Sequence, residues 1–146
     1  MKVGFIGLGN VGSKLSGSLL RNKVDLYVHD LNRDLVQKFK GFGATITNSP
    51  REMMNICDVV ITCLPSPSIS ASVMEGADGL LNSIKPSKVW MEMSTTDEAE
   101  VKRLGALVKN KGGQPVDCPV SGGCHRADTG NISISVSYTH LRAHET

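Results

Sequence analysis

Apolar residues along this chain follow two different spacings, one typical of strands and one typical of helices. Short apolar runs that suit strands alternate with segments in which apolar residues recur every three or four positions, as on one face of a helix. The strand-like runs are 2–6, 25–29, 43–47, 57–64, 88–94 and 113–120. The helix-like segments are 10–21, 32–39, 50–56, a segment after Pro67, and 96–111.

Strand and helix alternating from the first residue predict an α/β domain with a Rossmann-type, doubly wound parallel sheet in three layers. The run 57–64 is nearly all apolar and β-branched, which is typical of a central strand covered on both faces. Ligands of such sheets bind beyond the carboxyl ends of the strands, where the strand order reverses. We therefore expect a site in the loops that follow the strands.

Composition narrows the classes of function. The chain has 146 residues, 40% of them hydrophobic and 21% charged, as expected for one globular domain. Aromatic residues make up 4%, and the net charge is only +2, so we expect no nucleic-acid partner. No apolar run approaches the length of a membrane span, and no signal peptide precedes the first strand, so we expect a cytoplasmic protein without membrane contact.

Cysteine and histidine positions predict no metal site. The cysteines are Cys57, Cys63, Cys118 and Cys124. They include no C-x-x-C pair, and most lie in or beside apolar runs, where a free thiol behaves as a small core residue. His140 and His144 are four residues apart, but no third ligand accompanies them.

The segment "GLGNVG" is the first candidate binding loop. Gly7, Gly9 and Gly12 form a G-x-G-x-x-G pattern between a strand and a helix. Asp30 ends the next strand, about 20 residues on, as the dinucleotide-binding pattern requires. The first glycine permits a tight turn, the second lets a pyrophosphate approach the backbone, and the third lets helix and strand pack closely. The N–H groups at the helix start then attract the anion.

Asp30 also bears on the choice of cofactor. A carboxylate at this position accepts hydrogen bonds from the adenosine ribose and repels a 2′-phosphate, which favours NAD over NADP. Arg33 leaves NADP as the alternative, because a basic residue after the second strand can bind that phosphate. We interpret Arg33 as a solvated residue at a helix start.

Two later strand ends should face the same ligand. Leu64 and Pro65 turn the chain away from the sheet in "CLPSPS", and "MSTTDE" offers hydroxyls beside a helix start. We expect Thr96 to cap that helix, which leaves Thr95 free to contact the nicotinamide side of a dinucleotide.

Four ordered motifs resemble one enzyme family. "GFIGLGNVG", "CLPSP", "EMSTTDEAE" and "DCPVSGG" occur in this order in the β-hydroxyacid dehydrogenases. That family includes 3-hydroxyisobutyrate dehydrogenase, tartronate semialdehyde reductase and, more distantly, 6-phosphogluconate dehydrogenase. The resemblance covers about residues 1–134 and implies an NAD(P)-dependent oxidoreductase that transfers hydride between nicotinamide and a 3-hydroxy acid or its semialdehyde.

The resemblance also implies which residues bind. The cofactor residues would be Gly7, Leu8, Gly9, Asn10, Val11, Gly12, Asp30, Leu64, Pro65 and Thr95. The substrate's acid group would contact Ser121, Gly122 and Gly123, whose backbone N–H groups and hydroxyl form a set of donors suited to a carboxylate.

The sequence departs from the family after residue 134. The family's catalytic lysine belongs to a second, helical domain, and nothing here matches it, so we expect no catalytic residue in this chain and no turnover by it alone. Residues 135–146 keep no helix or strand period, and we expect them to be foreign to the fold. The full-length enzyme would be a homo-oligomer. The alternatives are a non-catalytic dinucleotide-binding module and an NADPH-dependent imine or semialdehyde reductase.

Overall fold

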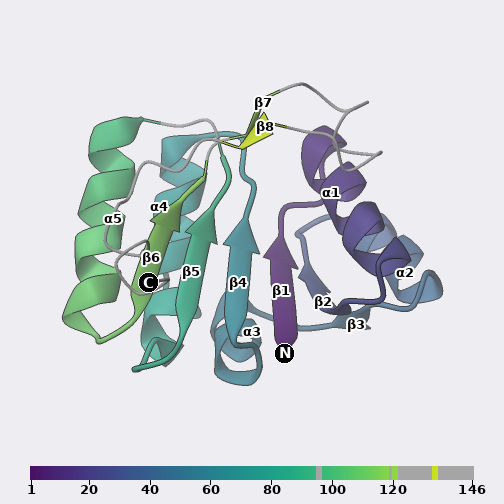
Figure 1. Cartoon of the computed structure of the whole chain (residues 1–146), viewed down its shortest axis with the longest axis horizontal. Helices are drawn as coiled ribbons and strands as arrows, with labels where there is room; N and C mark the ends of the chain where they lie inside the picture. The colour runs from purple at the N-terminus through teal and green to yellow at the C-terminus, as the bar shows by residue number, and fades with distance from the viewer. Residues whose placement is uncertain (95–96, 119, 122–132, 135–146) are drawn as a thin grey trace.

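A computed structural model describes residues 1–94, 97–118, 120–121 and 133–134. Strands and helices alternate along the described chain (Figure 1). The strands are β1 (Lys2–Ile6), β2 (Asp25–His29), β3 (Thr45–Ile46), β4 (Val59–Thr62), β5 (Val89–Glu92), β6 (Gln114–Asp117), β7 (Val120–Ser121) and β8 (Ser133–Ile134). The helices are α1 (Asn10–Arg21), α2 (Arg33–Gly41), α3 (Pro50–Ile56), α4 (Pro67–Glu75), α5 (Glu98–Asn110) and a short 3-10 helix, η1 (Leu80–Ser83).

The main sheet confirms the doubly wound fold expected from the sequence. Its strands run parallel in the order β3-β2-β1-β4-β5-β6, so the order reverses between β1 and β4. β7 and β8 form a separate antiparallel pair, with Ser121 opposite Ser133. A ligand site is therefore expected above the carboxyl ends of β1 and β4.

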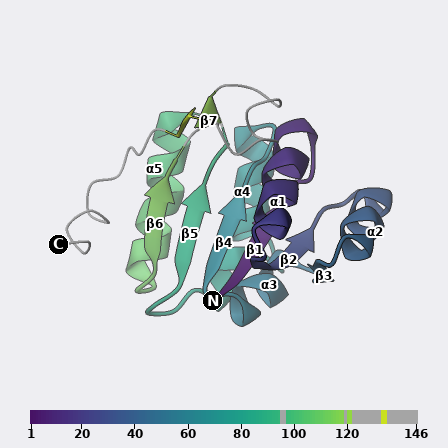
Figure 2. The same cartoon turned by 45° about the vertical axis from the view of Figure 1, so that its right-hand side comes forward.

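Alternate side chains of each strand enter two cores, one on each face of the sheet. Phe5 packs with α1 and α2 in one core, and the adjacent Ile6 packs with α3, α4 and α5 in the other. Figures 1 and 2 show α1 and α2 on the opposite side of the sheet from α4 and α5. This three-layer arrangement gives each central strand two apolar faces, as the run around β4 indicates.

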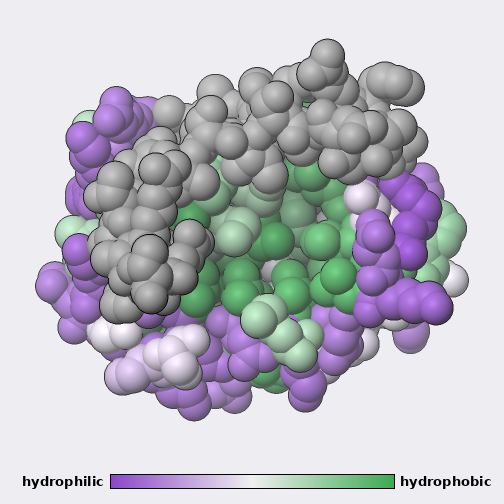
Figure 3. Space-filling model, in the orientation of Figure 1, coloured by the Kyte–Doolittle hydropathy of each residue, from purple (hydrophilic) through white to green (hydrophobic). Residues whose placement is uncertain are grey.

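The sheet face toward the viewer in Figure 1 is hydrophobic at its centre (Figure 3). Val59, Val89 and Met91 belong to the core on the α1 side but are only partly buried.

None of the helices in the described ranges is long and apolar enough to cross a membrane.

Side-chain caps set where most helices begin. Asn32 Oδ1 accepts hydrogen bonds from the N–H groups of Asp34 and Leu35, at 3.0 and 3.3 Å, and so begins α2. Ser49 Oγ caps Glu52 at 3.1 Å, with Pro50 as the first residue of α3. Both caps were expected from the sequence.

Several expectations about element ends were wrong. The third, fifth and sixth strands are shorter than the expected runs 43–47, 88–94 and 113–120. The cap of α5 is Asp97, not Thr96, because the Asp97 carboxylate accepts the N–H of Ala99 at 3.1 Å. The fourth strand is shorter than 57–64, because Cys57 still belongs to the end of α3 and the chain leaves the sheet after Thr62. Cys63 and Leu64, which were expected at the carboxyl end of this strand, instead line the candidate site.

Candidate functional site

A cleft of about 1020 Å³ lies at the carboxyl ends of β1, β2, β4 and β5. The residues that follow each of these strands line it, among them Gly7, Asp30, Leu64 and Ser94. These residues are far apart in sequence, and the parallel sheet brings them to one edge. The cleft thus occupies the point where the strand order reverses, as expected.

The glycine loop is shaped by close backbone packing. Gly7 has φ +104°, a conformation that L-residues rarely adopt, and a Cβ there would collide with the carbonyl oxygen of Cys63. A Cβ on Gly12 would collide with the carbonyl oxygen of Gly7. Gly9 is different, because a Cβ there would meet nothing within 4 Å and would enter open space. Gly7 and Gly12 therefore permit the close backbone packing of the loop, and Gly9 leaves the space in front of the loop open.

The start of α1 is left open to a ligand. Gly9 occupies its N-cap position, so no side chain caps the helix, and no acidic residue lies in its first turn. Among the α-helices of the described chain the other four have side-chain caps, from Asn32, Ser49, Ser66 and Asp97. Unpaired N–H groups and the positive end of the helix dipole suit an anionic group.

Asp30 connects the end of β2 to this loop. Its Oδ2 accepts the backbone N–H of Leu8 at 2.7 Å, and its Oδ1 accepts that of Asn32 at 2.8 Å. The side chain is partly exposed and lines the cleft. Each carboxylate oxygen keeps acceptor capacity for a further donor. The residue can therefore shape the loop and accept a ligand hydroxyl at the same time.

Apolar side chains form the rim beside Asp30, which the sequence reasoning missed. Leu31 is 92% exposed and Ile69 is 41% exposed, and both line the cleft with Leu35 and Val73. Such exposed apolar residues suit the face of a planar ring. The available signal was an apolar residue directly after Asp30, in a loop that is otherwise polar.

The other wall of the cleft contains the turn after β4. Leu64 and Pro65, which the family resemblance implies as cofactor residues, both line the cleft. The backbone N–H of Leu64 donates to Ser94 Oγ at 2.6 Å, which joins this turn to the residue after β5. Ser94 in turn donates to the buried side chain of Glu92 at 2.6 Å. The sequence reasoning included Ser94 among the hydroxyls of "MSTTDE" but missed Glu92, although an acidic residue within the apolar run "VWMEMS" is a visible anomaly.

The thiols near the site are neutral. Burial, helped by the charge of Glu92, raises the pKa of Cys63 to about 11, although this residue lines the cleft. Burial also raises the pKa of Cys57 to about 12 and that of Cys118 to about 11. Because the thiolate is the reactive form, these cysteines are unsuited to nucleophilic catalysis at neutral pH.

Several predicted site residues lie outside the described residues. These are Thr95, Gly122 and Gly123, together with the side chain of Ser121. The remaining predicted residues lie at the edge of the cleft: Gly7, Gly9, Asn10, Val11, Gly12, Asp30, Leu64 and Pro65 line it, and Leu8 donates to Asp30.

Known proteins resemble this chain in both sequence and fold. It is 36% identical over 134 residues to the mitochondrial 3-hydroxyisobutyrate dehydrogenase of Mus musculus, an alignment that covers 92% of the chain and 40% of the relative. The solved structure of Psf3 in complex with NADP+ and 2-OPP matches with a TM-score of 0.88 at 27% identity, over 92% of this chain and 48% of that one. The structure of Mycobacterium tuberculosis 3-hydroxyisobutyrate dehydrogenase with L-serine matches with a TM-score of 0.89 and covers 99% and 48% of the two chains; at 24% identity this likeness supports the fold alone.

The chain thus spans less than half the length of each of these three proteins. A family model described as the NAD binding domain of 6-phosphogluconate dehydrogenase matches residues 2–142. This match confirms the resemblance drawn from the four motifs. The chain belongs to the family of that NAD-binding domain.

Proposed function

We propose that this chain is the dinucleotide-binding part of an oxidoreductase that moves hydride between nicotinamide and a 3-hydroxy acid or its semialdehyde. The open start of α1 beside Asp30 is the observation that carries the proposal. A helix start without a side-chain cap, facing a cleft and flanked by a carboxylate, combines an anion site with an acceptor for ribose hydroxyls.

The cleft divides into two halves on either side of the glycine loop. A pyrophosphate would lie over Gly9 at the start of α1, where nothing obstructs its approach. The adenosine ribose would donate to Asp30, and the adenine ring would lie against Leu31. Because β4 is on the other side of β1 from β2, the nicotinamide half would extend toward Leu64 and Pro65.

NAD is the proposed cofactor. The Asp30 carboxylate lies where a 2′-phosphate would approach, and two negative groups there repel each other. Arg33 is exposed at the first position of α2, which keeps NADP as the alternative. The cofactor supplies the hydride chemistry, and the residues of this chain bind and orient it.

The substrate and the proton transfer are proposed to involve groups outside the described structure, including the side chain of Ser121. Ser121, Gly122 and Gly123 are proposed to bind the acid group of a substrate of the 3-hydroxyisobutyrate or 2-hydroxy-3-oxopropionate type. The proton is proposed to pass through a lysine beyond this sequence, as the family resemblance implies. We propose a folded unit over residues 1–134, with 135–146 outside it, and a homo-oligomeric full-length enzyme. The cytoplasmic compartment stays a prediction, since the mouse relative is named as mitochondrial.

Titration of the 146-residue chain with NADH and with NADPH, followed by nicotinamide fluorescence, tests the proposal. We expect saturable binding of both, with NADH the tighter ligand. Saturable binding of neither would overturn the proposed function, and tighter binding of NADPH would favour the reductase alternative. We also expect no oxidation of 3-hydroxyisobutyrate by this chain alone; measurable turnover would refute the need for the lysine.

A further inference from the structure

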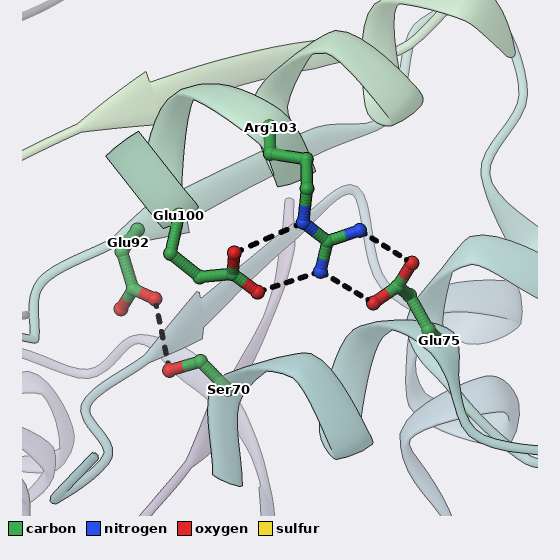
Figure 4. A network of polar contacts seen from close by, with 5 residues as sticks. All are labelled: Ser70, Glu75, Glu92, Glu100 and Arg103. Carbon is green, nitrogen blue, oxygen red and sulfur yellow. Dashed lines mark hydrogen bonds and ion pairs between the residues drawn. The ribbon is translucent and has the colours of Figure 1, made fainter. Parts of the chain in front are cut away.

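Glu92, the last residue of β5, is completely buried. Its Oε1 accepts three hydrogen bonds, from Thr62 Oγ1 at 2.9 Å, from the Ser94 N–H at 2.9 Å and from Ser94 Oγ at 2.6 Å. Its Oε2 accepts a longer bond from Ser70 Oγ of α4, at 3.4 Å (Figure 4). Among the ion pairs between described residues, none includes Glu92.

These hydrogen bonds connect the two loops at one end of the cleft. The Leu64 N–H donates to Ser94 Oγ, and Ser94 Oγ donates onward to Glu92. Leu64 and Ser94 both line the cleft, whereas Glu92 lies behind them. One carboxylate therefore holds the turn after β4 and the first residue after β5 in a single geometry.

The sheet itself does not need this carboxylate. Parallel backbone pairing already joins Glu92 to Thr62 on β4 and to Asp117 on β6. An apolar side chain of similar size would suit the buried position, but it would leave the hydroxyl of Thr62 and the N–H of Ser94 without an acceptor. Burial also raises the pKa of Glu92, which means that the apolar surroundings disfavour its charged form.

We propose that Glu92 is a positioning residue for the half of the cleft formed by Leu64, Pro65 and Ser94. This inference rests on the proposed function, in which that half receives the nicotinamide end of the dinucleotide. The adenosine end lies on the other side of β1, where Asp30 holds the glycine loop without involving Glu92. Loss of Glu92 should therefore weaken the binding of one end of the ligand and leave the other unchanged.

Comparing NADH with ADP separates the two ends. ADP carries only the adenosine diphosphate end, so calorimetric titration of both ligands measures each half of the cleft. We expect Glu92→Ala to weaken NADH binding by about tenfold, equal to about 1.4 kcal/mol, while ADP affinity stays within about twofold. Glu92→Gln should restore NADH binding, because its amide oxygen accepts the same three donors and its amide N–H can donate to Ser70.

Two further variants test whether a general loss of stability could explain weaker NADH binding. Val108→Ala removes core volume beside Gly113, which precedes β6 and so lies at the opposite end of the strands from the cleft. It should lower the melting temperature without changing the ratio of NADH to ADP affinity. Ser94→Ala breaks the connection between Leu64 and Glu92 while leaving the carboxylate in place, so it should act in the same direction as Glu92→Ala. If Glu92→Ala does not fold, as judged by circular dichroism, the NADH and ADP affinities of Ser94→Ala test the inference instead.

The outcomes distinguish the inference from the proposed function. A wild-type chain that binds neither ADP nor NADH would overturn the proposed function and the inference with it. A wild-type chain that binds both, with folded variants that lose both affinities equally or lose neither, would overturn the inference alone. Failure of Glu92→Gln to restore NADH binding would also contradict it, since the geometry of acceptors would then not be what matters.

Discussion

Asp30 at the end of β2 accepts the backbone N–H of Leu8 in the glycine loop at 2.7 Å. The residue expected to select the cofactor therefore also fixes the loop that would bind its phosphates. A second bond, from the N–H of Asn32 at 2.8 Å, orients the carboxylate from the side of α2. The Asp30 side chain therefore has two roles, because it carries a negative charge in the cleft and it holds the glycine loop through the Leu8 N–H. Substitutions at Asp30 can separate these roles.

Asp30→Asn should change cofactor preference more than it changes folding. Its amide oxygen can still accept the Leu8 N–H, at the expense of the exposed bond to Asn32, while the negative charge is lost. We expect the ratio of NADH to NADPH affinity to fall by about tenfold, or about 1.4 kcal/mol. Fluorescence titration with both nucleotides measures the ratio. Asp30→Ala, which also releases Leu8, should weaken both nucleotides; an unchanged ratio in Asp30→Asn would contradict the role of the charge.

Gly9→Ala and Gly12→Ala form a matched pair with opposite expected effects. A methyl group on Gly12 meets the carbonyl oxygen of Gly7, so we expect a loss of about 1–3 kcal/mol in the free energy of unfolding. A methyl group on Gly9 meets nothing within 4 Å, and its φ of −71° is ordinary for alanine. Its stability should stay within about 0.5 kcal/mol of wild type. NADH binding should nevertheless weaken by about tenfold or more, or about 1.4 kcal/mol.

Urea unfolding and NADH titration on the same two proteins test this pair. The emission of Trp90, the only tryptophan in the chain, reports unfolding because the residue is buried in wild type. Gly9→Ala binding NADH as tightly as wild type would show that the space in front of the loop is not where the ligand lies.

The fold was predictable because local signals agree with the global arrangement. The bounds of β1, α1 and β2 are the ranges 2–6, 10–21 and 25–29 expected from the sequence. Asn32 and Ser49 cap helices as their side chains predict. The alternation of elements predicts the parallel sheet, since parallel neighbours require helical crossovers.

The network around Glu92 was not predictable in the same way. Its partners Thr62 and Ser70 lie 30 and 22 residues earlier, and they meet Glu92 only once β4 and β5 pair and α4 covers them. The pattern of apolar residues marks position 92 as part of a strand but cannot say what an acid there contacts. Similarly, choosing Asp97 over Thr96 as the cap depends on the path of the loop between β5 and α5.

Arg103→Ala should cause a small, salt-sensitive loss of stability. The guanidinium of α5 forms two hydrogen bonds to Glu75 of α4, at 2.8 and 2.7 Å, and two to Glu100, at 2.6 and 2.9 Å (Figure 4). The pair joins two helices, but Arg103 is 46% exposed, so solvent weakens the attraction. We expect the melting temperature to fall, and the difference from wild type to shrink at about 1 M salt, where screening is strong.

Lys102→Ala is the matched control for this effect. Lys102 pairs with Glu98 on its own helix at 3.2 Å and is 69% exposed. Its removal should leave the melting temperature nearly unchanged at both salt concentrations. Equal effects of the two substitutions would show that the contact between α4 and α5 does not depend on Arg103.

Glu92 should make stability decline as pH rises. Burial raises its pKa in the folded protein above the ordinary value of 4.5, and the hydrogen bonds from Ser94, Thr62 and Ser70 oppose that rise only in part. Between these two pKa values the folded protein keeps the proton and the unfolded chain has lost it. The favourable contribution of this group is therefore complete below pH 4.5 and is lost as pH rises through the folded pKa.

Glu92→Gln cannot ionise, so it should escape that decline. Measured by urea unfolding, its free energy of unfolding relative to wild type should increase from pH 4.5 upward, with a slope of at most about 1.4 kcal/mol per pH unit, and then become constant. The neighbouring ionisable groups, Cys63 on the turn after β4 and Asp117 opposite Glu92 on β6, are present in both proteins, so their contributions largely cancel in the difference. Measurements below pH 9 also avoid the Cys63 thiol, whose pKa is about 11. A difference that stays flat from pH 4 to 9, or that falls with pH, would mean that Glu92 ionises as easily in the folded protein as in the unfolded chain.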